Sequence, residues 1–208
     1  MKLPMCFTPT ALVLDVAAEP VQRTLVTPLL PQEKSLWCWA AVSSMVTATY
    51  NPNEGTPQTS IVHGMLCSST CALGEANKPK NCCVDRAAPG DFPNSAARLG
   101  CGFTFVRHLD TYKQGTVDFA TLIERIDRDQ PVALHVASGG NGHFVVVTGY
   151  DDQGHVQILD PWPVASGSPV TGGMEAWVLY DSLIINYHGD HLTGKWDYTY
   201  FSDPTTGN

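Results

Sequence analysis

The chain has 208 residues, of which 43% are hydrophobic and 15% charged, and its formal net charge is −8. This length suits one domain, or one domain with two lobes, and the composition excludes a disordered chain. An acidic chain without long basic runs lacks the charges of a nucleic-acid surface, and no apolar stretch reaches the ~20 residues that span a bilayer. We therefore expect neither nucleic acid nor a membrane as a partner.

The N-terminal segment is rich in proline. Residues 1–31 contain five prolines, which indicates an extended arm, a pro-segment or a short edge strand. The apolar run near Leu12 follows Pro9 and ends at Asp15, so it makes a poor signal peptide. We expect a secreted or injected protein whose export does not depend on such a signal, and a piece cut from a larger chain would fit equally well.

The next part of the chain, about residues 32–100, is predicted to be helical. Residues 37–50, WCWAAVSSMVTATY, carry no charge and precede the helix breaker Asn51-Pro52, so we expect a buried helix there. Shorter helices are expected at residues 59–66 and 94–99.

From about residue 101 to residue 208 the pattern favours antiparallel strands. Runs of β-branched and aromatic residues alternate with glycine turns, and one helix is expected at 119–126, before Pro131. The expected strands cover residues 103–109, 131–137, 143–150, 155–160, 176–180 and 196–201. The sequence thus predicts an α+β fold with a cleft between its two halves.

Four of the seven cysteines fall close together, at Cys67, Cys71, Cys82 and Cys83. Disulfide bonds, a metal ion and free thiols all remain open. We favour disulfides, because two adjacent cysteines cannot easily ligate one tetrahedral ion. We expect no metal and no other cofactor, since the HGDH sequence at 188–191 has no third ligand at a known spacing.

Cys38 lies at the start of the predicted buried helix. A helix N-terminus presents unpaired N–H groups and the positive end of the helix dipole, which favour the nucleophilic thiolate. A buried structural thiol is the alternative. Gln32 precedes Cys38 by six residues, and its amide could complete an oxyanion hole with the backbone N–H of Cys38.

A nucleophilic cysteine needs a base, and His143 is the best candidate. It opens a strand after the turn SGGNG, and Asp160 ends the next strand, so the two lie nearly opposite each other in a hairpin. A carboxylate there could orient the imidazole, although a purely structural cross-strand pair is the alternative. The rival base His135 has its candidate carboxylates, Asp151 and Asp152, at the far end of the neighbouring strand.

These residues resemble the papain-like cysteine peptidases. The segment QEKSLWCWAA, with Trp39 supporting the nucleophile, resembles that superfamily's oxyanion-hole and nucleophile segment. The later GHFVVVTGY and ILDPW resemble its histidine strand and its Asn/Asp position. The WCWAA form is most similar to the bacterial branch that includes staphopain-like and plant-pathogen avirulence peptidases. The resemblance covers about residues 30–162, and papain's own CGSCW is absent.

The resemblance implies a role for each matching residue. Cys38 attacks the scissile carbonyl, and His143 accepts its proton and later protonates the leaving amine. Asp160 holds the imidazole. Gln32 stabilises the oxyanion, and Trp162 shields the His–Asp contact from water.

The resemblance also implies a two-lobe peptidase domain at 32–208, with an interlobe cleft. We expect a monomeric effector that acts on a protein or peptide substrate, with a specific inhibitor or immunity protein as a further partner. Two alternatives remain. One is a peptidoglycan amidase or transglutaminase-like acyltransferase that uses the same residues, and the other is a non-catalytic, disulfide-stapled binding module.

Overall fold

The computed structural model describes residues 21–53, 55–67, 99–163, 172–189 and 192–204. Helices and an antiparallel sheet are combined in it, which confirms the α+β class. Three of the cysteines predicted to form disulfides, Cys71, Cys82 and Cys83, lie outside the described residues, as does the side chain of Cys67.

The strands form an antiparallel sheet with the order β2-β8-β3-β4-β5-β6, and β1 adds to β4 and β7 to β8. Their bounds are β1 Gln22–Thr24, β2 Leu109–Gln114, β3 Val132–Ser138, β4 Asn141–Asp151, β5 His155–Asp160, β6 Met174–Leu179, β7 Tyr187–His188 and β8 Thr193–Ser202. The predicted hairpins of the C-terminal half are therefore present. Strand β1 lies inside the predicted arm at 1–31 and extends the sheet along β4.

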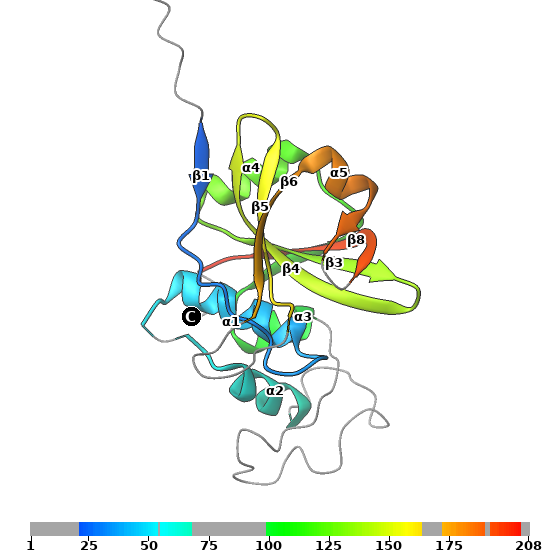
Figure 1. The fold of residues 1–208 in the computed structure, drawn as a ribbon. Coiled ribbons are helices and arrows are strands. Elements are labelled where there is room, and N and C mark those ends of the chain that lie inside the picture. Colours follow the sequence, from blue (N-terminus) through cyan, green and yellow to red (C-terminus); the bar gives the residue numbers. More distant parts are fainter. Residues whose placement is uncertain (1–20, 54, 68–98, 164–171, 190–191, 205–208) are drawn as a thin grey trace, which may run out of the picture.

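Five helices accompany the sheet in the described residues: α1 Cys38–Tyr50, α2 Gln58–Cys67, α3 Leu99–Phe105, α4 Phe119–Asp127 and α5 Tyr180–Ile185. Helices α1, α2 and α3 gather at one end of the molecule, and α4 and α5 lie at the other end (Figure 1). Because strand side chains alternate between faces, the sheet contributes to two separate cores. Phe144 and Val146 pack with α1, α2 and α3, whereas Val145 and Val147 pack in the second core, which includes α4 and α5 side chains.

The tight turn between β3 and β4 determines where β4 begins. Ser138 pairs with Asn141, and the two residues between them, Gly139 and Gly140, have φ values of 54° and 90°. Such left-handed turns twist in the same sense as the strands they join, and glycine adopts them without steric cost. The turn therefore places His143 near the exposed tip of this hairpin, at the end of the sheet where α1 begins.

The predicted strand at 103–109 is wrong in its first half, because α3 continues to Phe105 and β2 begins only at Leu109. Leu99, Gly102 and Phe103 are buried at helical spacing. A Cβ on Gly102 would lie 2.3 Å from the Ser43 hydroxyl oxygen, so glycine permits this helix to pack closely on α1. Tertiary packing thus overrides the β propensity of the aromatic residues.

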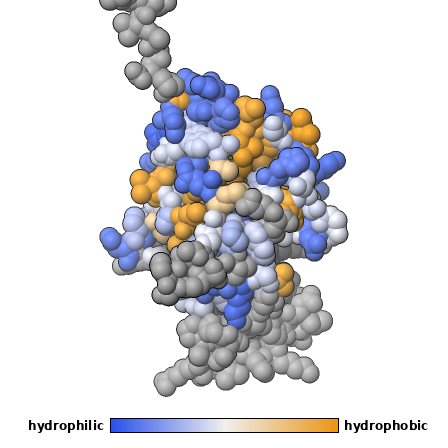
Figure 2. Space-filling view, in the orientation of Figure 1, coloured by the Kyte–Doolittle hydropathy of each residue, from blue (hydrophilic) through white to orange (hydrophobic). Residues whose placement is uncertain are grey.

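The surface of β6 and α5 carries exposed apolar side chains, namely Trp177, Leu179, Ile184 and Ile185. Hydrophobic residues are visible on this part of the molecule in Figure 2. Within the described ranges, no helix is long and apolar enough to cross a membrane.

Candidate active site

Cys38 is the first residue of α1 and is a free cysteine with an exposed fraction of 7%. The N-cap residue, Trp37, makes no side-chain capping bond, and the first turn contains no acidic side chain. No carboxylate of that turn therefore offsets the positive end of the helix dipole, which is directed toward the sulfur.

His143 joins Cys38 to Asp160. Its imidazole hydrogen-bonds to Cys38, and its Nε2 lies 2.6 Å from Asp160 Oδ1. Because Nε2 is occupied by the carboxylate, Nδ1 is the nitrogen available to the sulfur. Val146 pairs with Leu159, so Asp160 is level with Val145, two residues along the same face from His143. The structure therefore brings these three predicted site residues together.

The surroundings of His143 favour its charged form. Burial alone would lower the pKa of this histidine. The hydrogen bonds and charges of Asp160 and Cys38 outweigh that effect and raise the pKa to about 9. The imidazolium is therefore the resting form at neutral pH, held between a carboxylate and a sulfur.

Asp160 is almost fully buried, with an exposed fraction of 1%, and three groups donate to it. Oδ1 accepts from His143 and from the backbone N–H of Trp162, at 2.8 Å, and Oδ2 accepts from the Tyr187 hydroxyl, at 2.5 Å. Burial would raise the pKa of Asp160, but His143 and the two other donors lower it below its usual value. The carboxylate is therefore ionised and fixed in orientation.

Tyr187 was not predicted as a site residue. It lies 27 positions after Asp160, on the short strand β7, and only the folded chain brings the two side chains together. No spacing rule connects the tyrosine to the carboxylate.

Gln32 is fully buried, and the backbone on both sides of it is held. Gln58 accepts from the Glu33 N–H at 3.0 Å and donates to the Pro31 carbonyl at 2.8 Å, while the Gln32 N–H donates to the Pro161 carbonyl at 2.8 Å. The Gln32 side-chain Nε2 donates to the Lys34 carbonyl at 2.8 Å. An amide nitrogen has two N–H bonds, so this bond leaves one donor for another acceptor.

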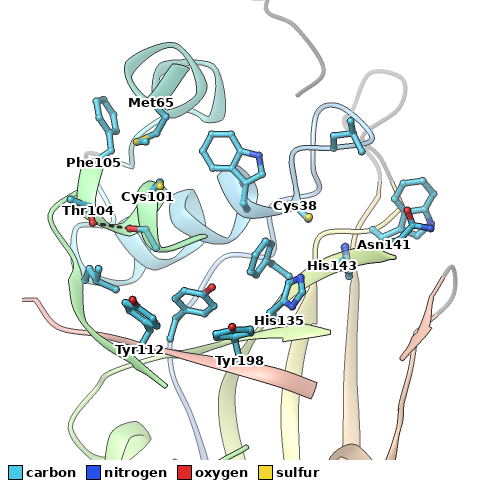
Figure 3. A pocket seen from close by; sticks show the side chains of 18 of the residues that line it. Cys38, Met65, Cys101, Thr104, Phe105, Tyr112, His135, Asn141, His143 and Tyr198 are labelled. Atoms are coloured by element: carbon cyan, nitrogen blue, oxygen red, sulfur yellow. Dashed lines mark hydrogen bonds between the residues drawn. The ribbon is translucent and has the colours of Figure 1, made fainter. Parts of the chain in front are cut away.

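A cavity of about 1280 Å³, lined by Cys38 and His143 among others, lies between the helices and the sheet. Figure 3 shows Cys38 and His143 next to each other in it, with Tyr112 and Tyr198 farther along the same cavity. Its other lining residues include Trp39, Met65, Phe105, Trp162 and Tyr200. Cys101 also lines the cavity but is disulfide-bonded, so it does not compete with Cys38 as a thiol.

A comparison with protein families matches residues 24–177, more than half of the chain, to the Peptidase_C39 like family. The chain belongs to this family. The match is consistent with the papain-like cysteine peptidase superfamily and confirms the resemblance found in the sequence. A comparison with curated proteins found no match.

This member of the Peptidase_C39 like family has a second histidine–carboxylate pair, and its histidine, His135, lines the same cavity. His135 Nδ1 lies 2.6 Å from Asp197 Oδ1, and the His135 ring packs on Phe144 with ring centroids 4.7 Å apart. Only carboxylates near the neighbouring strand of the hairpin were expected as partners of His135, and Asp197, which lies on β8, was not predicted. The hydrogen bond to Cys38 distinguishes His143 from His135.

The other histidines with described partners make structural contacts. His108 Nδ1 lies 3.1 Å from the Asp203 carbonyl oxygen, and His155 Nδ1 lies 2.8 Å from Asp151 Oδ2 in the β4–β5 turn. His188 is near the Thr193 hydroxyl, at 3.4 Å, while the rest of the HGDH segment at 190–191 lies outside the described residues. In the part of the chain that the structure describes, no group of three or more potential ligands could hold a metal ion.

Proposed function

We propose that this protein hydrolyses peptide bonds through Cys38, His143 and Asp160. The observation that carries the proposal is the continuous hydrogen-bonded series from the sulfur through the imidazole to the buried carboxylate. A cysteine peptidase requires a nucleophile and a base in contact, with a third group that orients the base. Membership of the Peptidase_C39 like family supports the same chemistry.

The reaction begins with a thiolate and an imidazolium. The Cys38 sulfur attacks the scissile carbonyl carbon, and the carbonyl oxygen becomes an oxyanion. Collapse of this intermediate breaks the C–N bond, and the imidazolium of His143 donates its proton to the leaving amine. A thioester then joins the acyl group to Cys38.

Hydrolysis of the thioester uses the same groups in reverse order. The neutral His143 accepts a proton from water, which attacks the thioester carbonyl and releases the carboxylic acid. The sulfur leaves as a thiolate beside the regenerated imidazolium. Asp160 remains ionised throughout, because its role is to orient His143 and to stabilise its positive charge.

Gln32 is our candidate for the side-chain donor to the oxyanion, together with the Cys38 backbone N–H. The second N–H of its amide and the three hydrogen bonds that hold residues 31–33 support this role. Fixed donors stabilise an oxyanion without reorganising during the reaction. Trp162 lines the cavity next to Asp160 and would exclude water from the carboxylate–imidazole contact.

The wider proposal concerns the organisation of the chain and its setting. The cavity between α1, α3 and the sheet supports a two-lobe arrangement, with about 32–100 and 101–208 as the lobes of a domain at 32–208. Residues 1–31 would be an arm or pro-segment whose last part joins the sheet through β1. The resemblance to avirulence peptidases supports an exported or injected bacterial effector that acts on proteins as a monomer, with a specific inhibitor or immunity protein as its partner.

The test is incubation with an unfolded protein, purified peptidoglycan and an amine acceptor, using the wild-type chain and Cys38→Ala. We expect new N-termini in the protein substrate with the wild type and none with the variant. Release of peptides from peptidoglycan alone, or transfer to the amine without hydrolysis, would replace the peptidase with an amidase or an acyltransferase. Equal hydrolysis by both chains would refute the role of Cys38.

A further inference from the structure

Tyr187 is a buried residue whose polar atom is directed at the candidate site. Its side chain is 1% exposed, and its ring packs in the second apolar core with Leu183 and Trp196. Its hydroxyl donates to Asp160 Oδ2 at 2.5 Å. A buried tyrosine needs a hydrogen-bond partner for its hydroxyl. Here that partner is the carboxylate that also binds His143.

The two carboxylate oxygens of Asp160 have different partners. Oδ1 faces His143 and the Trp162 N–H, whereas Oδ2 faces Tyr187. Rotation of the carboxylate about its Cβ–Cγ bond would break the bonds on both sides. The phenolic hydroxyl therefore fixes the angle at which Oδ1 meets His143 Nε2.

We propose that Tyr187 is a positioning residue for the cysteine peptidase site, which acts on Cys38 by holding Asp160 in the orientation that binds His143. The expected effect of Tyr187 on turnover rests on the proposed function. Its effect on the reactivity of the Cys38 sulfur can be measured without any substrate.

Gly189 supports the placement of the tyrosine ring. A Cβ at this position would lie 2.7 Å from Tyr187 Cε1 and 2.9 Å from its hydroxyl oxygen. Only a residue without a side chain leaves the ring where it is. The packing of Tyr187 therefore explains why the HGDH segment has a glycine at position 189, without a metal ion.

The test compares Tyr187→Phe with the matched variant Tyr180→Phe. Tyr180 is partly buried and packs against the same core, but its hydroxyl donates to the Val117 carbonyl, at 2.7 Å. Each substitution removes one phenolic hydroxyl and the hydrogen bond described for it. Only the first removes a donor to Asp160, so a general loss of stability would affect both variants alike.

Two rates are measured for each variant, alongside its thermal unfolding. The first is alkylation of Cys38 by iodoacetamide, with peptide mapping of the modified thiol, and the second is peptide hydrolysis. For Tyr187→Phe we expect slower alkylation and a kcat about tenfold lower, the order of one hydrogen bond to a charged group, with KM unchanged. For Tyr180→Phe we expect both rates to equal those of the wild type.

Gly189→Ala provides a second perturbation that leaves the hydroxyl in the chain. Because its Cβ displaces the ring, we expect slower alkylation of Cys38 here too, and little additional loss when it is combined with Tyr187→Phe. Wild-type rates in Tyr187→Phe, or equal losses in Tyr180→Phe, would overturn the proposal. Slower alkylation in a chain that hydrolyses no peptide would uphold the role of Tyr187 and refute the peptidase function.

Discussion

Replacing Asp160 with asparagine tests the electrostatic part of the site. The substitution keeps the size of the side chain but removes its charge. The amide nitrogen must then face either His143 or Tyr187, both of which are donors to the native carboxylate. The variant therefore loses at least one hydrogen bond together with the ion pair.

The size of the effect follows from the pKa of His143. The interactions that raise this pKa from 6.5 to about 9 favour the buried imidazolium by about 3 kcal/mol. Asp160 supplies part of this effect, and the substitution also removes at least one hydrogen bond to a charged group, which by itself corresponds to roughly tenfold in rate. We expect Asp160→Asn to lower kcat/KM at neutral pH by at least about that factor.

The raised pKa of His143 determines how the stability and the activity of the protein change with pH. Because the folded-state pKa of His143 is raised, the stability gained from its charge is complete below about pH 6.5. It is lost as the pH rises through about 9. The basic limb of kcat/KM should therefore lie near pH 9 in the wild type and move toward 6.5 in Asp160→Asn. The free energy of unfolding of the variant should also depend less on pH across this interval.

The assay is hydrolysis of a fluorescent protein substrate between pH 5 and 10, with Asp197→Asn as the control. Asp197 binds His135 at the same 2.6 Å separation that joins Asp160 to His143, and both histidines line the same cavity. The control should leave the basic limb in place. A basic limb that is unmoved in Asp160→Asn, or that moves equally in both variants, would refute the reasoning.

Two further predictions separate the roles of neighbouring residues. His135→Ala should change KM through the cavity wall but leave the alkylation rate of Cys38 unchanged, and slower alkylation would make His135 the base. Gln32→Ala should lower kcat by about 10²-fold without slowing alkylation, because its donor acts only on the oxyanion. The thermal unfolding of Gln32→Ala is measured as well, because the lost hydrogen bond to the Lys34 carbonyl costs about 1 kcal/mol of stability. An unchanged kcat would exclude the oxyanion role.

The sequence predicted best what local rules determine. The charge-free segment that begins at Cys38 forms α1, and the glycine turns set the hairpin register that brings His143 and Asp160 together. These features depend on helix termini and on neighbouring strands. The order of residues along the chain is enough to predict them.

Contacts between distant segments could not be predicted in this way. Asp197 reaches His135 because β8 inserts beside β3, 62 positions away, and Tyr187 reaches Asp160 through the second core. No single-sequence pattern specifies which strands become neighbours in a mixed-order sheet. The end of α3 was mispredicted for a related reason, since close packing of Gly102 on Ser43 is visible only in the fold.

The measurement that tests the central claim most directly is alkylation of Cys38 at pH 6 by iodoacetamide, in the wild type and in His143→Ala. The paired imidazolium should keep the sulfur reactive at this pH, so we predict rapid, selective modification of Cys38 in the wild type and at least tenfold slower modification in the variant. Equal rates in the two proteins would show that His143 does not activate the sulfur, and would contradict the account.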